Sequence, residues 1–264
     1  MKNYFFTSES VTEGHPDKLC DNIADKIVNE CVEQDKDSRV AVDAIAAKDT
    51  IYIVGQITTN AKINIEEIVR NHLKEVGYDN QNLDIDYRTC KIITNITQQS
   101  NDISNIVGKN GAGDQGTIFG YACNETEELM PLPIVMAKEL TNLLTYVRKN
   151  NIVEGLRPDG KSQVTIEYRE DKPFRIEHIV LSTQHLDKKP LDVLRKEIYE
   201  QVIMQSKYSN LIDSNTKIDI NKNGKFVIGG PLADTGLTGR KLMVDTYGGM
   251  AKHRWWSTFR KRLK

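Results

Sequence analysis

The sequence predicts an α+β protein that contains two copies of one structural unit. The order helix, strand, strand, helix occurs once before residue 97 and again after residue 130. The second strands of the two copies also end alike, in Ile57-Thr58-Thr59 and in Leu181-Ser182-Thr183. Units of this length and number are too long and too few for a solenoid. Because helices would cover one face of each sheet, we expect the two sheets to pack together through their open faces.

The first copy is predicted to begin with an amphipathic helix from Pro16 to about Gln34. Proline fits the first turn of a helix. The apolar stripe behind it recurs at four-residue spacing and consists of Leu19, Ile23, Ile27 and Cys31. The runs 39–46 and 50–59 are rich in β-branched residues and predict two strands, and a second helix is expected to start at Asn64. Before the first helix, Ser8 and Ser10 with Glu13 are typical of turns and helix caps.

The second copy repeats this order after a Pro-rich start. Apolar periodicity predicts a helix over 131–150 and another over 190–205. Between them, the alternating runs 161–169 and 175–183 predict two strands.

Composition narrows the class of protein. Of 264 residues, 28% are charged and 39% hydrophobic, with a net charge of −1, which is typical of a globular protein and predicts no nucleic-acid partner. No apolar run reaches the ~20 residues of a membrane helix, and the first ten residues do not resemble a signal peptide. The cysteines form no CxxC pair, which is typical of reduced cysteines in a cytoplasmic protein; they are Cys20, Cys31, Cys90 and Cys123.

A glycine-rich phrase at residues 111–116, GAGDQG, is the first candidate binding element. Glycine allows close approach of the backbone to a ligand, and Asp114 could hold a metal, a ribose hydroxyl or an ammonium group. The alternative interpretation is a tight turn. The surrounding stretch 97–116 is polar and long for a connection, which favours a lid over a ligand or a disordered segment.

Two further segments carry groups suited to an anion. His15 and Asp17 lie at the start of a predicted helix, where free N–H groups favour negative charge. The more common interpretation of these residues alone is a turn residue and a first-turn carboxylate. Asp234, Arg240 and Lys241 lie among small residues in 226–249. The Arg-Lys pair suits a polyphosphate, and the alternative is a solvated basic turn.

Taken together, residues 4–253 resemble the S-adenosylmethionine synthetases, also called methionine adenosyltransferases. The resemblance is carried in order by FTSES-V-x-EGHPDK, GAGDQG-x-x-FGYA-x-NET, RPD-x-KSQV, IVLSTQH and FVIGGP-x-x-D-x-GLTGRK-x-x-VDTYGGM. It implies three similar α+β repeats about a pseudo-threefold axis, of which this chain has two complete repeats and the start of a third. The implied divisions are an N-terminal repeat (3–101), a mobile lid (102–116), a central repeat (117–230), the start of a third repeat (231–253) and an aberrant tail (254–264).

The resemblance also implies an activity. Members of the family make S-adenosylmethionine when the methionine sulfur attacks the 5′ carbon of ATP, and they then cleave the released triphosphate to phosphate and pyrophosphate. Two Mg²⁺ ions per site and K⁺ are implied as cofactors, and a homodimer or homotetramer with shared active sites as the assembly. No membrane partner is expected.

Residue roles follow from the matching motif positions. The resemblance implies that His15 helps the triphosphate to leave and that Asp17 binds Mg²⁺. The nucleotide contacts it implies are Asp159, Lys161, Lys225, Phe226 on the adenine side, Asp234, Arg240 and Lys241. The catalytic set is His15, Lys161, Arg240 and Lys241, and the methionine set is Gln56, Gln99, Asp114 and Asp234.

Two of these positions depart from the family pattern. Gln56 replaces a glutamate that holds the methionine ammonium, which predicts weaker methionine binding because a charged acceptor makes a stronger hydrogen bond. Asp43 replaces a glutamate of the K⁺ site and is one methylene shorter, which predicts weaker or no activation by K⁺.

The last eleven residues leave the family pattern altogether. One coding of residues 254–263, read one base later, gives Gly-Gly-Gly-Ala-Leu-Ser-Gly-Lys-Asp, the family phrase, so we interpret the tail as a frameshift product. A rival interpretation is that Trp255 and Trp256, with their basic neighbours, contact nucleic acid or an anionic surface. The expectation is therefore that this chain alone makes little S-adenosylmethionine. The alternative function is a non-catalytic remnant that binds ATP or pairs with a complete subunit.

Overall fold

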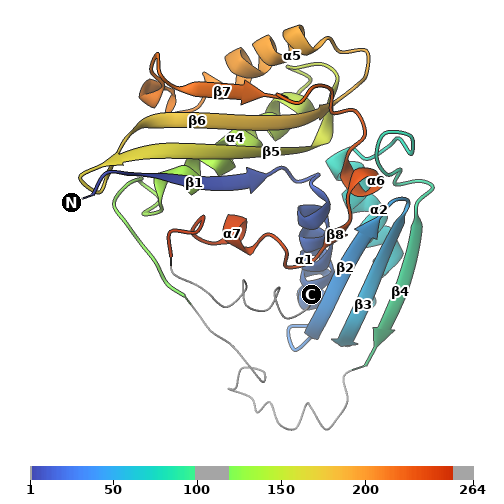
Figure 1. Cartoon of the computed structure of the whole chain (residues 1–264). Coiled ribbons are helices and arrows are strands. Elements are labelled where there is room, and N and C mark those ends of the chain that lie inside the picture. The colour runs from blue at the N-terminus through green and yellow to red at the C-terminus, as the bar shows by residue number, and fades with distance from the viewer. Residues whose placement is uncertain (1, 99–118, 252–264) are drawn as a thin grey trace, which may run out of the picture.

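The computed structural model describes residues 2–98 and 119–251 (Figure 1). Gln99, Asp114, the expected lid at 102–116 and the expected tail at 254–264 lie outside these residues.

The first predicted unit is confirmed. It consists of α1 (Pro16–Gln34), β2 (Arg39–Ala47), β3 (Thr50–Thr58) and α2 (Ile65–Val76). The side chain of Asn64 caps α2 by accepting from the Glu67 N–H. A strand that was not predicted, β4 (Lys91–Thr97), then pairs parallel to β3.

The second unit is confirmed as well, and it ends in the same way. It contains α4 (Leu132–Lys149), β5 (Leu156–Arg169), β6 (Lys172–His185) and α5 (Leu191–Ile198). The predicted helix to residue 205 is α-helical only as far as Ile198, because a π-helical turn, η1 (Tyr199–Ile203), replaces its last turns. After a short η2 (Ser209–Leu211), β7 (Lys217–Ile220) pairs parallel to β6, as β4 does to β3.

Each unit takes its fourth strand from another part of the chain. The strand orders are β1-β5-β6-β7 and β4-β3-β2-β8. β1 (Tyr4–Val11) precedes the first unit but pairs antiparallel with β5 of the second. β8 (Gly236–Leu237) follows the second unit, between α6 (Gly230–Ala233) and α7 (Leu242–Asp245), and pairs antiparallel with β2 of the first. The two units are therefore joined by exchanged edge strands.

The prediction that Ser8 and Ser10 belong to turns or caps is wrong, since both lie in β1. They face inward and are 3% and 2% exposed. The Ser8 hydroxyl donates to the Gly248 carbonyl, and the Ser10 hydroxyl pairs with that of Thr141 in α4. Buried hydrogen bonds therefore stabilise serine at positions where a strand normally carries apolar side chains.

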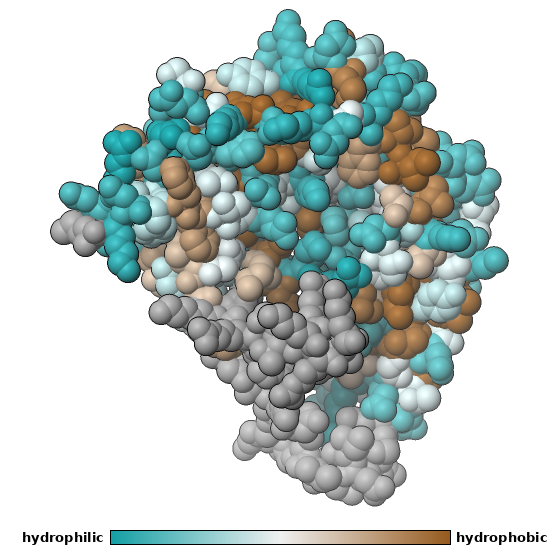
Figure 2. Space-filling model, viewed as in Figure 1, coloured by the Kyte–Doolittle hydropathy of each residue, from teal (hydrophilic) through white to brown (hydrophobic). Residues whose placement is uncertain are grey.

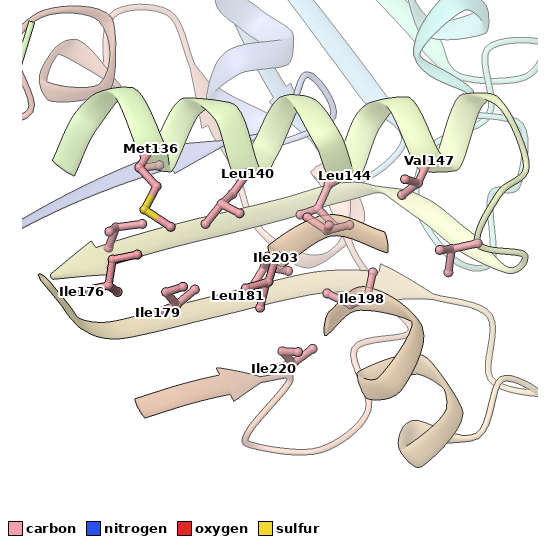
Figure 3. Close-up of a cluster of buried hydrophobic side chains, with 14 of the residues drawn as sticks. Met136, Leu140, Leu144, Val147, Ile176, Ile179, Leu181, Ile198, Ile203 and Ile220 are labelled. Atoms are coloured by element: carbon pink, nitrogen blue, oxygen red, sulfur yellow. The ribbon is translucent and has the colours of Figure 1, made fainter. Parts of the chain in front are cut away.

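The two sheets do not share a core, so the expectation that they pack through their open faces is wrong for the described residues. The buried hydrophobic residues form two clusters without a common member. In the second unit, Met136, Leu140 and Leu144 of α4 point toward the sheet, opposite residues of β6 such as Ile179 (Figure 3). In the first unit, α1 and α2 cover the sheet in the same way. Each such fully buried side chain contributes about 1.5–3 kcal/mol.

Candidate functional site

The start of α1 is built around His15. His15 is the N-cap residue, and its Nδ1 accepts a hydrogen bond from the Asp17 N–H at 3.2 Å. Because Nδ1 is an acceptor, the proton of the neutral ring lies on Nε2. The free N–H groups of the 19-residue helix α1 add a positive potential at this end.

The loop before His15 is locked to the start of β5. The Thr12 hydroxyl donates to the Pro158 carbonyl at 2.7 Å, and the Thr12 N–H donates to Gly160 at 2.9 Å. Gly14 lies so close that an added Cβ would come within 2.5 Å of the Pro158 oxygen. Only glycine allows this approach, which brings the EGHPDK and RPDGK phrases together.

Asp17 is buried, 2% exposed, and binds the segment around β8. Its carboxylate accepts from the Leu237 N–H at 3.0 Å and from Lys241 Nζ at 2.7 Å, while Arg240 Nε lies 3.4 Å away. Both cations of the predicted polyphosphate pair therefore meet the carboxylate at the start of α1. Figure 2 shows hydrophilic residues gathered in the centre of this face, between the two units.

The charges around His15 come from three separate motifs. Burial, together with the positive charges of Lys241 and Lys161, lowers the His15 pKa to about 4, while Asp17 and Asp234 oppose the change. His15 is therefore a neutral N–H donor at pH 7, surrounded by two lysines and two carboxylates.

Asp159 is the second buried carboxylate of the site and is 7% exposed. It accepts a hydrogen bond from the Gly230 N–H at 2.8 Å. Burial raises its pKa to about 6, against the opposing effect of this hydrogen bond, the Gly160 N–H and Lys161. Asp159 thus fixes the segment before β8 against β5.

Four further predicted residues lie on parts of the chain other than those that carry His15, Asp17 and Asp159. Gln56 in β3 and Asp43 in β2 share the face of their sheet opposite α1 and α2. Lys225 pairs with the Asp187 carboxylate at 2.6 Å, at the molecular surface. Phe226 is half-buried, and its main chain is bound to His185.

The structure adds polar residues that the sequence prediction missed. Tyr78, fully buried after α2, donates its hydroxyl to the Gly14 carbonyl. Asp84 binds Arg157 through two nitrogens, at 2.7 and 3.0 Å, and burial raises its pKa to about 6. Gln184 and His185, both 0% exposed, belong to the IVLSTQH phrase. That phrase was the available signal, but it gave no role for either side chain.

The ranges 2–98 and 119–251 contain no group of three His, Cys, Asp or Glu side chains that could hold a metal ion. A lone carboxylate such as Asp17 suits Mg²⁺, which commonly keeps waters and takes substrate phosphates as its other ligands. None of the described helices is long and apolar enough to cross a membrane.

The repeated α+β fold, with a neutral imidazole among cations and buried carboxylates, defines an enzyme that handles an anionic substrate. Three family models match the chain: the N-terminal domain of S-adenosylmethionine synthetase at residues 3–101, its central domain at 109–226 and its C-terminal domain at 228–259. The chain therefore belongs to the S-adenosylmethionine synthetase family, the methionine adenosyltransferases that make S-adenosylmethionine from ATP and methionine.

Curated relatives agree with this assignment. The S-adenosylmethionine synthase of Finegoldia magna is 49% identical over 267 residues, which cover 96% of this chain and 68% of the relative. That of Brachyspira hyodysenteriae is 48% identical over 266 residues, with coverage of 96% and 68%. That of Desulfosudis oleivorans is 47% identical over 259 residues, with coverage of 96% and 67%. The resemblance and the fold class predicted from the sequence are thus confirmed.

Proposed function

We propose that one group of residues binds the triphosphate of ATP and catalyses transfer of the adenosyl group to methionine. This His15 group consists of His15, Asp17, Lys161, Asp234, Arg240 and Lys241. The observation that carries this proposal is the neutral His15 at the start of α1, with Lys161 and Lys241 acting on it from two other motifs. In the reaction the methionine sulfur attacks C5′, the C5′–O bond breaks, and its electron pair leaves with the triphosphate. The product is a sulfonium ion, and water then cleaves the triphosphate to phosphate and pyrophosphate.

His15 is suited to the C5′–O cleavage step. Its Nε2–H can donate a hydrogen bond to the departing 5′ oxygen, on which negative charge develops. Lys161, Arg240 and Lys241 supply positive charge for the triphosphate, and Arg240 adds a planar fork for two oxygens. Because His15 is neutral at pH 7, it acts as a donor without adding a fixed charge to the resting site.

Some of the acidic residues would bind a metal ion, and others would bind the nucleotide. Asp17 would hold Mg²⁺, and two Mg²⁺ ions per site would neutralise charge on the bound triphosphate. Asp159 and Asp234 would contact the nucleotide, with Phe226 on its adenine side and Lys225 near it. Asp43 would hold K⁺.

Methionine would be bound by Gln56, Gln99, Asp114 and Asp234. Gln56 and Asp43 lie on the sheet face opposite the helix that starts at His15. This separation supports a homodimer or homotetramer in which one subunit contributes these residues to the site of another. The chain's division into repeats at 3–101, 117–230 and 231–253 is part of the same proposal.

The test is S-adenosylmethionine formation by the purified chain from ATP and methionine, with Mg²⁺ and K⁺. We expect this chain to form only a small amount of product. His15→Asn should lower that amount about 100-fold or more, because a donor to the departing oxygen is lost. The matched control is His178→Asn, since His178 pairs with Asp219 at 3.0 Å, away from the His15 group. ATP binding without any product would contradict the proposal and would favour the binding-only alternative.

A further inference from the structure

His185, at the end of β6, has no part in the proposed reaction but makes three hydrogen bonds. Its N–H donates to the Phe226 carbonyl at 2.9 Å. Its Nε2 lies 3.1 Å from the Phe226 nitrogen, whose N–H donates to it. Its Nδ1 lies 2.9 Å from the Leu186 carbonyl. Both main-chain polar groups of Phe226 are therefore bound to one fully buried residue.

These contacts define the tautomer of His185. A backbone N–H can only donate, so Nε2 must carry the lone pair, and the proton must lie on Nδ1. That proton is directed at the Leu186 carbonyl, which can only accept. The ring is thus neutral with both nitrogens satisfied.

Gln184 holds the next residues of the same segment. Its Nε2 donates to the Val227 carbonyl at 3.0 Å and to the Leu83 carbonyl at 3.1 Å. Its Oε1 accepts from the Asp159 N–H at 3.3 Å. A Cβ on Gly229 would lie 2.6 Å from the Gln184 side chain, so the segment packs directly on it.

We propose that His185 is a positioning residue, assisted by Gln184, that fixes Phe226 where the adenine base of the nucleotide binds. The proposal rests on the proposed function, because it takes the base to be the group that meets Phe226. A residue whose main chain is already fixed at two points needs less ordering when a base stacks on its ring, and this improves affinity. His185 itself touches neither substrate, since it is buried behind the main chain of Phe226.

Two substitutions test the roles of the two ring nitrogens of His185 separately. His185→Gln places a carbonyl oxygen near the position of Nε2 and keeps the acceptor for Phe226. His185→Asn reaches only the position of Nδ1, so it keeps the donor to Leu186 and loses that acceptor. Because both replacements are polar amides, a difference between them reports the contact to Phe226.

The first measurement is hydrogen–deuterium exchange of a peptide that contains Phe226, in the full chain without ligand. We expect exchange at this amide to be at least tenfold faster in His185→Asn and close to wild type in His185→Gln. Equal exchange in all three proteins would overturn the proposal. If His185→Asn does not fold, exchange is compared between His185→Gln and Gln184→Met instead. We expect exchange close to wild type in His185→Gln and faster exchange in Gln184→Met, which loses the contact to Val227.

The second measurement compares binding of ATP with binding of tripolyphosphate, which lacks the base. We expect His185→Asn to weaken ATP binding about tenfold and to leave tripolyphosphate binding within twofold, with recovery of ATP binding in His185→Gln. Equal weakening of both ligands, or unchanged ATP binding, would overturn the role in base binding. If the wild-type chain binds neither ligand, the proposed function fails, and the exchange data still decide whether His185 positions Phe226.

Discussion

Burial sets the charge of single residues in this site. It lowers the pKa of His15 to about 4 and raises that of Asp159 to about 6, so both groups move toward their neutral forms. Asp17 is equally buried but is paired with Lys241. The site therefore combines a neutral donor, one carboxylate with a raised pKa and one ion pair, on elements of both units.

Gln56→Glu tests the departure in the predicted methionine site. The substitution restores a charged acceptor for the methionine ammonium, and a charge-assisted hydrogen bond is about twice as strong as a neutral one. We expect the KM for methionine to fall about tenfold while the KM for ATP stays unchanged. The comparison is made by steady-state assay at fixed ATP, with Gln163→Glu on the other sheet as the control. An unchanged methionine KM would reject this role for Gln56.

Single residues also show where prediction from sequence stopped. Leu19, Ile23 and Ile27 are each 0% exposed, as their spacing predicted, because apolar periodicity directly reflects burial. The strand that contains Ser8 and Ser10 was not predicted, because the burial of these serines depends on partners in α4 and after α7. The roles of Asp84 and Gln184 depend on residues about 70 to 100 positions away, which local pattern cannot reveal.

At the scale of elements, the end of α2 supports the start of α1. Tyr78 follows α2 and donates to the carbonyl of Gly14, the residue before the N-cap of α1. Burial raises its pKa, so the phenol remains a donor throughout the neutral range. Gly230, with φ of 57°, packs on the same hydroxyl, and an added Cβ would lie 2.5 Å from it. Three segments of the site therefore meet at one phenol group.

Tyr78→Phe removes this hydroxyl alone and leaves the Gly14 carbonyl unpaired. We expect the free energy of unfolding to fall by about 1–3 kcal/mol, since an unsatisfied buried acceptor costs that much. Tripolyphosphate binding should weaken as well, because the loop before His15 loses a support. Chemical denaturation and calorimetric titration measure the two effects. Tyr146→Phe, at a side chain that is 57% exposed, should change neither; if it matched Tyr78→Phe, the role of the Gly14 contact would be refuted.

At the scale of the whole molecule, polar contacts join the two units. Glu13, before α1, binds Arg148 at 2.6 Å and Lys149 at 2.8 Å, both at the end of α4. His72 of α2 lies near this junction and is 5% exposed, and neither ring nitrogen has a hydrogen-bond partner among the described residues. The charges that act on it are Lys26 of α1, Glu75 of α2 and Lys149 of α4.

This junction should make the fold sensitive to acid. Burial lowers the His72 pKa from 6.5 to about 4, with Lys26 adding to the effect. The unfolded chain therefore binds a proton more readily, and stability falls as pH decreases from about 6.5 to 4, by up to about 3 kcal/mol from this group. The lowered pKa of His15 has the same effect on stability over the same pH range. His72→Leu should therefore remove only part of the pH dependence of stability. Urea unfolding at several pH values measures it, with His178→Leu as the control. An unaltered pH slope in His72→Leu would show that His72 ionisation does not contribute.

The exchanged strands also constrain the order in which the chain folds during synthesis. β1 pairs with β5 from Tyr4 opposite Tyr168 to Val11 opposite Lys161. A ribosome must therefore produce about 160 further residues before β1 finds its partner, and β2 waits longer still for Gly236. Until then the emerging first unit has an unpaired edge, of the kind that promotes association between nascent chains. Chaperone binding to the nascent chain would be most useful over this interval, which ends only when both late strands have emerged.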